Sequence, residues 1–227
     1  SQVNKINWRD AIIIFLILHV LVYPSSNGYN SYMDRDTGSI GGIKNPLQPT
    51  KQLFYVSVII DVAALALSFF ITPFFALGIL LYILASRAYS YRKIRLKKYP
   101  ITGYLTVVIF QGAFTFFLVS YGSVSNHSSD VSVIGIIAAG LLVGGSYPLT
   151  QIYQHEDDLK DGVQTISYKL GYKGTFIFTG IVYALAFGML VVLFFLKNEL
   201  SHFLVLQIFM APVLVYFFIW FSKVVKN

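Results

Sequence analysis

Seven long apolar segments constrain the fold of this 227-residue chain more than any other feature. A helix needs about 20 mostly apolar residues to cross the hydrocarbon core of a bilayer. Only 12% of the residues are charged, against roughly 25% in a soluble domain, so there is too little polar material to cover a water-soluble core. The sequence therefore predicts an all-α, polytopic transmembrane helix bundle in which residues 1–227 form a single domain. The seven candidate spans run approximately over residues 11–26, 53–71, 73–91, 102–121, 131–150, 174–196 and 203–222.

The basic residues predict the orientation of this bundle. If the loops alternate between the two sides, 14 of the 17 Lys and Arg residues fall on one side, and only Lys5, Arg9 and Lys197 on the other. The positive-inside rule makes the richer side cytoplasmic. We therefore expect a multi-pass protein of the cell (inner) membrane, with its long loops at about 27–52, 87–101 and 151–173 in the cytoplasm. This placement accounts for the net charge of +7, so no nucleic-acid partner is expected.

A repeated pattern opens the first and the third of these loops. The segments Tyr23–Asp34 and Tyr147–Asp158 both fit Y-P-x-x-[N/Q]-x-x-[N/Q]-x-x-x-D. On a helix, residues three, four and seven positions apart share one face. Each segment therefore presents two amides and one carboxylate as a stripe at the end of a span. The first stripe is Asn27, Asn30 and Asp34, and the second is Gln151, Gln154 and Asp158.

The two stripes together favour a binding site, whereas one stripe alone would be interpreted as a solvated helix end. Polar groups at membrane depth are costly unless they pair or face a cavity. Two stripes around one cavity would offer hard oxygen ligands, which suit Mg²⁺. Asp157 adds a carboxylate beside Asp158. Glu156 and Asp161 are expected to be ordinary loop charges, and Asp36 lies off the first stripe.

The middle loop carries six positive charges between Arg87 and Lys98, counting both ends. Such charges fix topology and contact lipid headgroups, each contributing about 1 kcal/mol near an anionic surface. A second role is capture of a diphosphate, because metal ions held by carboxylates and cationic side chains together stabilise a leaving pyrophosphate. Arg95 and Lys97 are our candidates for this role.

Together these segments resemble the UbiA-type family of membrane prenyltransferases, which includes 4-hydroxybenzoate polyprenyltransferases, menaquinone-pathway enzymes and chlorophyll synthases. The family's first motif, N-D-x-x-D-x-x-x-D, matches Asn30 and Asp34, while Ser31 and Gly38 replace the outer aspartates. In the stretch that follows, Asn45 stands where the family has an arginine.

The second family motif, D-x-x-x-D followed by G-x-x-T and L-G, is the more specific match. Gln154 replaces its first aspartate, and the matching residues are Asp158, Gly162, Thr165, Leu170 and Gly171. The Y-S-x-x-P-x-R-L-K loop of some members matches at Tyr89, Ser90, Arg95, Leu96 and Lys97.

The resemblance implies the family's helical fold, a Mg²⁺-bound polyprenyl diphosphate in a central cavity, and transfer of the prenyl group to an aromatic, quinonoid or other lipophilic acceptor, as in quinone biosynthesis. It also leads us to expect an apolar, aromatic-lined cavity that excludes water from an allylic carbocation. Taken with the stripes, it assigns roles to the following residues. Catalytic roles fall to Asp34, Asp158, Arg95 and Lys97; substrate binding to Asn27, Asn30, Lys44, Tyr89, Gln151 and Gln154; and Mg²⁺ coordination to Asn30, Asp34, Asp157 and Asp158.

The departures from the family pattern leave alternatives open. Three family aspartates and one arginine are neutral here, which favours a non-catalytic relative that binds isoprenoid lipid or a partner protein. The family usually has nine spans, and alignment of the motifs leaves the first and last without a counterpart. A small transporter would need charged residues deep in several spans, but only Asp61 is plainly inside one, where a hydrogen bond to a neighbouring helix explains it. The acceptor, the prenyl chain length and the oligomeric state stay open.

Overall fold

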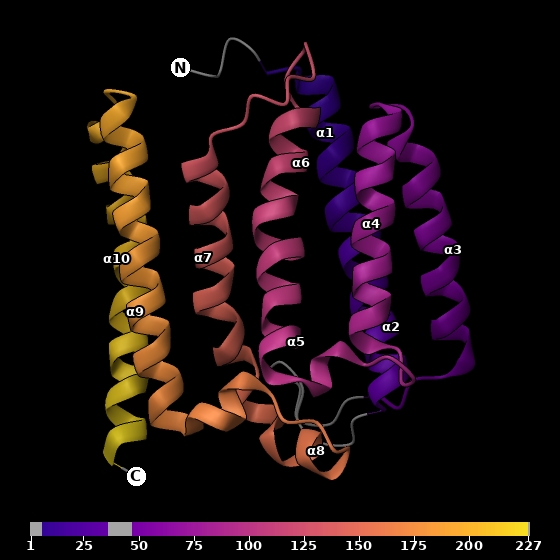
Figure 1. Ribbon diagram of the computed structural model, residues 1–227, viewed down its shortest axis with the longest axis vertical. Helices are drawn as coiled ribbons and strands as arrows, with labels where there is room; N and C mark the ends of the chain where they lie inside the picture. Colours follow the sequence, from indigo (N-terminus) through magenta and orange to yellow (C-terminus); the bar gives the residue numbers. More distant parts are fainter. Residues whose placement is uncertain (1–5, 36–46, 227) are drawn as a thin grey trace.

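Upright helices packed side by side make up the protein, as its computed structural model shows (Figure 1). The structure describes residues 6–35 and 47–226. Within these residues, seven helical spans are long and apolar enough to cross a membrane, which confirms the predicted fold class. The described chain starts at one end of the bundle with α1 and finishes at the other end with the last turn of α10, and the short helix α8 lies at this second end (Figure 1).

The first four spans include two that are interrupted by π-helical turns. The elements of these spans are α1 (Trp8–Leu16), the π-helix η2 (Ile17–Val22), α2 (Tyr23–Asp34), α3 (Lys51–Ser68), α4 (Pro73–Ser90), the 3₁₀ turn η3 (Leu96–Lys98), α5 (Pro100–Val107), the π-helix η4 (Val108–Phe114) and α6 (Thr115–Gly122).

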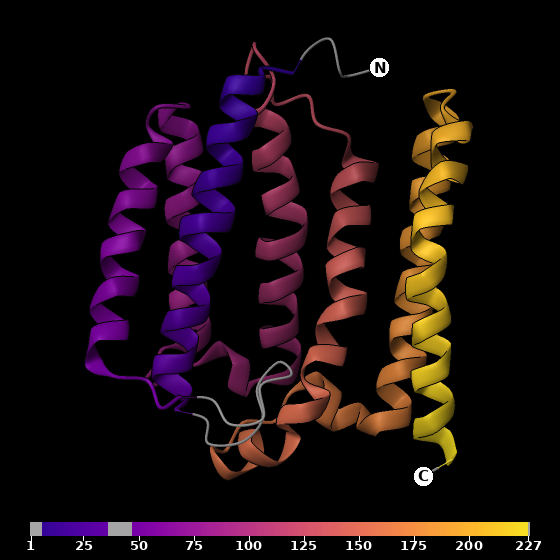
Figure 2. The same cartoon turned by 180° about the vertical axis from the view of Figure 1, so that it is seen from behind.

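The last three spans include the longest helices. Their elements are α7 (Val133–Thr150), the 3₁₀ turn η5 (Ile152–Gln154), α8 (His155–Lys160), α9 (Ile166–Leu196) and α10 (Leu200–Lys226). Helix α9 changes direction at Gly171, whose φ of 67° suits a residue without a side chain. Helix α10 lies along α9 at the edge of the bundle (Figure 2).

Local sequence signals explain where several spans begin. Helix α4 starts at Pro73, which needs no hydrogen-bond acceptor at this position, and the Thr72 hydroxyl accepts a bond from the Phe75 amide at 3.0 Å. Ser132 and Thr165 cap α7 and α9 in the same way, at 3.2 Å each. These caps set the ends of the helices that carry the polar motifs.

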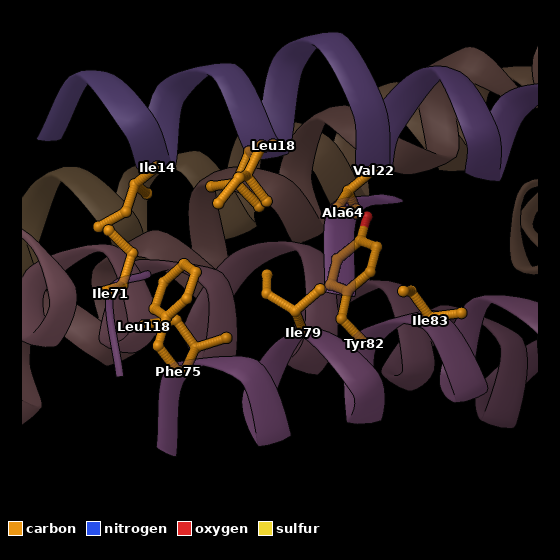
Figure 3. Packing of buried hydrophobic residues seen from close by; sticks show 11 residues of the cluster. Ile14, Leu18, Val22, Ala64, Ile71, Phe75, Ile79, Tyr82, Ile83 and Leu118 are labelled. Atoms are coloured by element: carbon orange, nitrogen blue, oxygen red, sulfur yellow. The ribbon is translucent and has the colours of Figure 1, made fainter. Parts of the chain in front are cut away.

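The hydrophobic core of the first half joins the first span to α4 and α6. Ile14, Leu18 and Val22 of the first span face Phe75 and other apolar residues of α4, with Leu118 of α6 beside them (Figure 3). Phe75, Ile79 and Ile17 are fully buried. This packing fixes the first motif helix against α4.

The second half instead uses close backbone approach. A Cβ on Gly112 of η4 would lie 2.8 Å from the Cα of Gly140 on α7, so only glycine fits there. On the other side of α7, the Thr179 hydroxyl of α9 donates to the Gly145 carbonyl at 2.9 Å. Small residues at helix crossings are typical of membrane bundles, and here they hold α7 between η4 and α9.

Two expectations need correction at the motif end of the bundle. Helix α2 continues to Asp34, so the first span ends later than the predicted residue 26, and the first stripe lies on the last turns of a helix, as its spacing predicted. Arg87, counted as a loop charge, lies inside α4 and pairs with Asp61 of α3. The prediction that Asp61 bonds a neighbouring helix is confirmed, because it also accepts a bond from Ser25 of α2.

Candidate active site

One polar chamber of about 450 Å³ opens at the end of the bundle where α2, α4 and α7 end. Its wall combines residues of the two motif segments, the basic loop and η4. The lining residues are Ser26, Asn27, Asn30, Ser86, Tyr89, Ser90, Lys97, Val107, Gln111, Val143, Ser146, Tyr147, Thr150, Gln151, Gln154, Asp158 and Thr165.

The two stripes that reach this chamber differ in secondary structure. The first stripe lies on the unbroken helix α2. The second passes from Gln151, the C-cap of α7, through η5 to Asp158 on α8. Asn27 and Asn30 nevertheless line the same chamber as Gln151, Gln154 and Asp158, so the structure brings together the two stripes that the repeat predicted.

Lys97 joins the carboxylates of the two motifs. Its Nζ lies 2.6 Å from Oδ2 of Asp34 and 3.8 Å from Oδ1 of Asp158. All three side chains are buried. Asp158 lines the chamber, whereas Asp34 contacts the Lys97 ammonium group but is not among the lining residues. The two aspartates therefore meet through a shared lysine.

Arg95 forms a second ionic junction beside this lysine. Its guanidinium donates to Asp161 and also contacts Asp34 at 3.4 Å. Arg92 adds a contact to Asp161 at 3.4 Å. Asp161, expected to be an ordinary loop charge, instead anchors the basic loop; Glu156 is exposed as expected.

The ionic contacts of Arg95 and Asp161 shift the pKa values of both groups. Burial of Arg95 opposes its charge, but the hydrogen bond and the charge of Asp161 outweigh this, so the pKa of Arg95 is raised. Burial likewise acts to raise the pKa of Asp161, but the bond from Arg95 and the nearby cations hold that pKa below its ordinary value. Both groups are therefore charged at neutral pH.

The backbone of the basic loop is fixed against α5. Arg95 adopts a left-handed conformation, with φ of 49°, and caps the turn η3 that carries Lys97. Gly103 packs so closely that a Cβ there would lie 2.9 Å from the Cα of Lys97 and 3.2 Å from the carbonyl oxygen of Leu96. Lys97 is thus held in position and is not a freely moving surface lysine.

Hydrogen bonds also order the chamber wall. The Ser90 hydroxyl donates to the Asn30 side-chain oxygen at 2.7 Å. The hydroxyls of Tyr89 and Tyr147 bond to each other, and the Gln151 amide donates to Tyr147 at 2.8 Å. Tyr89, predicted to bind substrate, therefore reaches the chamber as part of a bonded pair.

Three of the predicted site residues in the described part of the chain are not among the lining residues of the chamber, namely Asp34, Arg95 and Asp157. Asp157 instead pairs with Lys160, whose Nζ lies 2.9 Å from Oδ1 of Asp157. Lys44 lies outside the described residues, as does Asp36.

The chamber wall carries many polar side chains, and the expected apolar, aromatic-lined cavity stays a prediction. Among the described residues, its aliphatic lining residues are Val107 and Val143, and its aromatic ones are Tyr89 and Tyr147. Gln111, Ser86 and Ser146 lie on spans and face the chamber. Gln111 sits in the π-helix η4, a feature often found at functional sites. In the sequence, Gln111 is distinguished only as a lone glutamine within an apolar span.

The oxygen atoms of the chamber suit a small hard cation such as Mg²⁺. No group of three or more His, Cys, Asp and Glu side chains able to hold a metal was found in residues 6–35 and 47–226. However, Mg²⁺ commonly takes one or two protein carboxylates and fills its shell with water and phosphate oxygens. Asp158 supplies a carboxylate, and the side-chain oxygen of Gln151 is buried without a hydrogen-bond partner. The donor set therefore fits one such ion.

Comparisons with known proteins identify the family and the fold. The model of the UbiA prenyltransferase family matches residues 2–226. A structure of a UbiA homolog from Archaeoglobus fulgidus bound to Cd²⁺ has a TM-score of 0.69 and 20% identity, covering 96% of this chain and 77% of its own. Two further structures of a UbiA homolog from Archaeoglobus fulgidus, one bound to DMAPP and Mg²⁺ and one bound to GPP and Mg²⁺, each have a TM-score of 0.67 and 18% identity, covering 92% of this chain and 73% of their own. A comparison with curated proteins finds no match.

Proposed function

The chain belongs to the UbiA prenyltransferase family, and from this premise we propose that it transfers a prenyl group from a prenyl diphosphate to a lipophilic acceptor within the polar chamber. The observation that carries the proposal is the meeting of both motif ends at Lys97, which contacts Asp34 and Asp158. Its seven apolar spans make it an integral membrane protein, and its substrates would come from the bilayer.

The basic loop is suited to the diphosphate. Its residue Lys97 lines the chamber, and its residue Arg95 contacts Asp34, which also pairs with Lys97. Cationic side chains in a partly buried site stabilise the charge that develops on a leaving diphosphate. The homologs bound to DMAPP and GPP with Mg²⁺ support this class of ligand.

Mg²⁺ would be held by Asp158 together with amide oxygens from Asn30, Gln151 and Gln154. When bound, it would neutralise part of the diphosphate charge. Asp157, originally assigned to the metal, pairs with Lys160 and is left out of this set. Asp34 acts on the same site through Lys97.

The transfer breaks the bond between C1 of the prenyl group and the diphosphate oxygen, and the electron pair leaves with the diphosphate. The acceptor's nucleophilic atom forms the new bond to C1, and its proton passes to the departing diphosphate. Lys97 and Arg95 stabilise the leaving group, and the hydroxyls of Tyr89 and Tyr147 border the position of C1.

The deep wall of the chamber would orient the acceptor. Gln111, Ser86 and Ser146 present an amide and hydroxyls toward the chamber interior, which suits an acceptor whose reactive end carries hydrogen-bonding groups. An adjoining crevice of about 30 Å³ adds Tyr82, Phe110 and Thr106 to wall residues that it shares with the chamber, and the rings of Tyr82 and Phe110 offer apolar contact to one end of the prenyl group.

The proposal is tested by incubating the purified protein with Mg²⁺, geranyl diphosphate and a panel of aromatic, quinonoid and hydroxyl-bearing acceptors, followed by mass spectrometry of the lipids. We expect a product heavier than one acceptor by one prenyl group, lost on addition of EDTA. Absence of both product and diphosphate release would contradict the enzyme assignment. Binding of geranyl diphosphate without turnover would favour the non-catalytic isoprenoid-binding relative.

We also propose that the chamber opens to the cytoplasm. The exposed basic residues Lys98, Lys160 and Lys169 lie at that end, as the positive-inside rule requires. The chain has no cysteine, so a single cysteine at Lys98 or at Ser129 can be labelled cleanly in whole cells. A membrane-impermeant maleimide should label the Ser129 position and spare the Lys98 position until the membrane is broken. The reverse pattern would contradict this orientation.

A further inference from the structure

A buried histidine, His155, begins the short helix α8 and has no role in the prenyl transfer proposed above. His155 is 8% exposed. It directly follows Gln154 and precedes Asp158 by three residues. Both of these neighbours line the chamber, whereas His155 is not among the described lining residues. The imidazole is therefore next to the site along the chain without forming its wall.

A chain of hydrogen bonds runs from His155 across the bend in α9. Nε2 of His155 lies 2.9 Å from the hydroxyl oxygen of Ser167, which precedes the bend at Gly171. The Ser167 hydroxyl lies 3.0 Å from that of Thr175, which follows the bend. The Thr175 hydroxyl also donates to the Gly171 carbonyl at 2.7 Å. Ser167 and Thr175 are fully buried, so water cannot replace a lost partner at no cost.

Aromatic contacts hold the same imidazole on both sides of the bend. Its ring stacks on the Tyr172 ring, with centroids 5.1 Å apart and an interplanar angle of 17°. The edge-to-face contact with Tyr168 has a centroid distance of 5.7 Å. Tyr168 precedes Gly171 and Tyr172 follows it. His155 therefore connects α8 to both arms of the bent helix.

Helix α8 depends on such contacts because it is short. It spans His155–Lys160, and a helix of so few residues is not stable by itself. The Val163 amide donates to the Asp158 carbonyl at 2.7 Å and so fixes the second half of α8. No side chain caps its start. The contacts of His155 with α9 are thus the anchor at the end of α8 that adjoins Gln154.

We propose that His155 is a positioning residue, which holds Gln154 and Asp158 at the chamber by tying the start of α8 to both arms of the bent helix α9. This inference rests on the proposed function, because Gln154 and Asp158 belong to the set proposed to hold Mg²⁺ with the diphosphate. Loosening the start of α8 would leave these oxygen atoms in place for only part of the time, and the affinity for the metal would fall.

The test measures metal affinity in the purified protein. Mn²⁺ is titrated in the presence of geranyl S-thiolodiphosphate, an unreactive analogue, and free Mn²⁺ is measured by electron paramagnetic resonance. His155→Ala and Ser167→Ala should each weaken Mn²⁺ binding by about 10- to 100-fold, the usual loss when a residue that orients a ligand is removed. The double variant should lose no more than either single one, because the two side chains form one bond.

Two further variants separate positioning from general packing. His155→Gln can keep a side-chain nitrogen facing Ser167 and should recover part of the affinity. Thr179→Val removes another buried hydroxyl from α9, away from the bend, and should bind Mn²⁺ like the wild type. In the transfer assay, His155→Ala should need more Mg²⁺ for its half-maximal rate, while kcat at saturating Mg²⁺ stays near the wild-type value.

Thermal unfolding shows which variants are folded, and Ser167→Ala, which deletes a single oxygen atom, keeps the test decisive if His155→Ala does not fold. Wild-type Mn²⁺ affinity in a folded Ser167→Ala overturns the inference and leaves the proposed function intact. Additive losses in the double variant, or a His155→Gln as weak as His155→Ala, also overturn it. A wild type that binds neither the analogue nor Mn²⁺ overturns the proposed function, and this inference with it.

Discussion

The two motif segments share a sequence pattern but differ in the secondary structure that leads each of them to the chamber. In the first, Pro24 follows the π-helical turn Ile17–Val22, and the helix then continues without a break to Asp34. In the second, Pro148 lies inside α7, the helix ends at Thr150, and a 3₁₀ turn and α8 follow. A proline removes one backbone donor from a helix. The first span has a π-helical turn just before Pro24 and continues as a helix, whereas α7 ends soon after Pro148.

The difference places the two carboxylates in unequal positions. Asp158, on the broken segment, lines the chamber. Asp34, on the continuous helix, contacts Lys97 and Arg95 but is not among the lining residues. A repeated motif therefore does not mean repeated roles. We interpret Asp158 as a ligand of the substrate complex and Asp34 as the residue that positions Lys97.

The largest expected effect separates these two roles. Asp158→Asn should lower kcat/KM for prenyl transfer by about 10³-fold, because it removes a charged group that touches the substrate complex. Asp34→Asn should cost only about 10- to 100-fold, the usual loss for a residue that acts through another. The exposed neighbour Glu156→Gln serves as a control and should retain wild-type activity.

Rates of product formation at several Mg²⁺ concentrations check this order. Excess Mg²⁺ should restore part of the Asp34→Asn activity and little of the Asp158→Asn activity. Equal losses in the two variants would show that the motifs act symmetrically, against our interpretation.

A second comparison concerns how each motif helix is anchored in the bundle. Ser25 of α2 bonds to Asp61, which pairs with Arg87, and the Arg87 guanidinium lies 4.0 Å from the Tyr29 ring centre. In the second segment, the residue that matches Ser25 in the repeat is Leu149. Helix α7 is held instead by small-residue packing and by the neutral bond from Thr179 to Gly145. The first helix thus combines its apolar packing with an ion pair, whereas the second relies on close packing.

These anchors should differ in their contribution to stability. Asp61→Asn leaves the Arg87 charge without its partner and should lower the free energy of unfolding by about 3 kcal/mol. Thr179→Val removes one neutral hydrogen bond within a span and should cost about 1 kcal/mol or less. Unfolding curves in mixed micelles of increasing SDS content measure both. A larger loss for Thr179→Val would contradict the comparison.

The smallest expected effect concerns Asp161, which follows the second motif. Its folded pKa lies below the ordinary value, so its contribution to stability is present above the unfolded pKa and is lost as pH falls through the folded pKa. No change is expected between about pH 6 and pH 8 from this group, and a decline is expected below about pH 4. Melting temperatures of the wild type should therefore fall more steeply in acid than those of Asp161→Asn. Parallel acid curves would contradict the Arg95–Asp161 pair.

Most of the fold could be predicted from the sequence, because hydropathy alone marks each stretch of about 20 apolar residues that is long enough to cross a bilayer. The convergence of the two stripes was also predictable, because two matching polar stripes at membrane depth favour one shared cavity. The positions of Arg87 and Asp161 were not. Each pairs with a residue far away in the sequence, and such pairing leaves no periodic signal. The π-helical turns were missed for a similar reason, because a shift of one hydrogen bond does not alter the apolar pattern.

Gly103 extends the sensitive region of the protein beyond the chamber. It belongs to α5, it is not among the lining residues, and it touches the turn that carries Lys97. A methyl group added there would collide with the backbone of that turn, so the turn would have to shift and carry the lysine ammonium group with it. A substitution at Gly103, near the start of α5, can therefore impair prenyl transfer although this residue does not line the chamber.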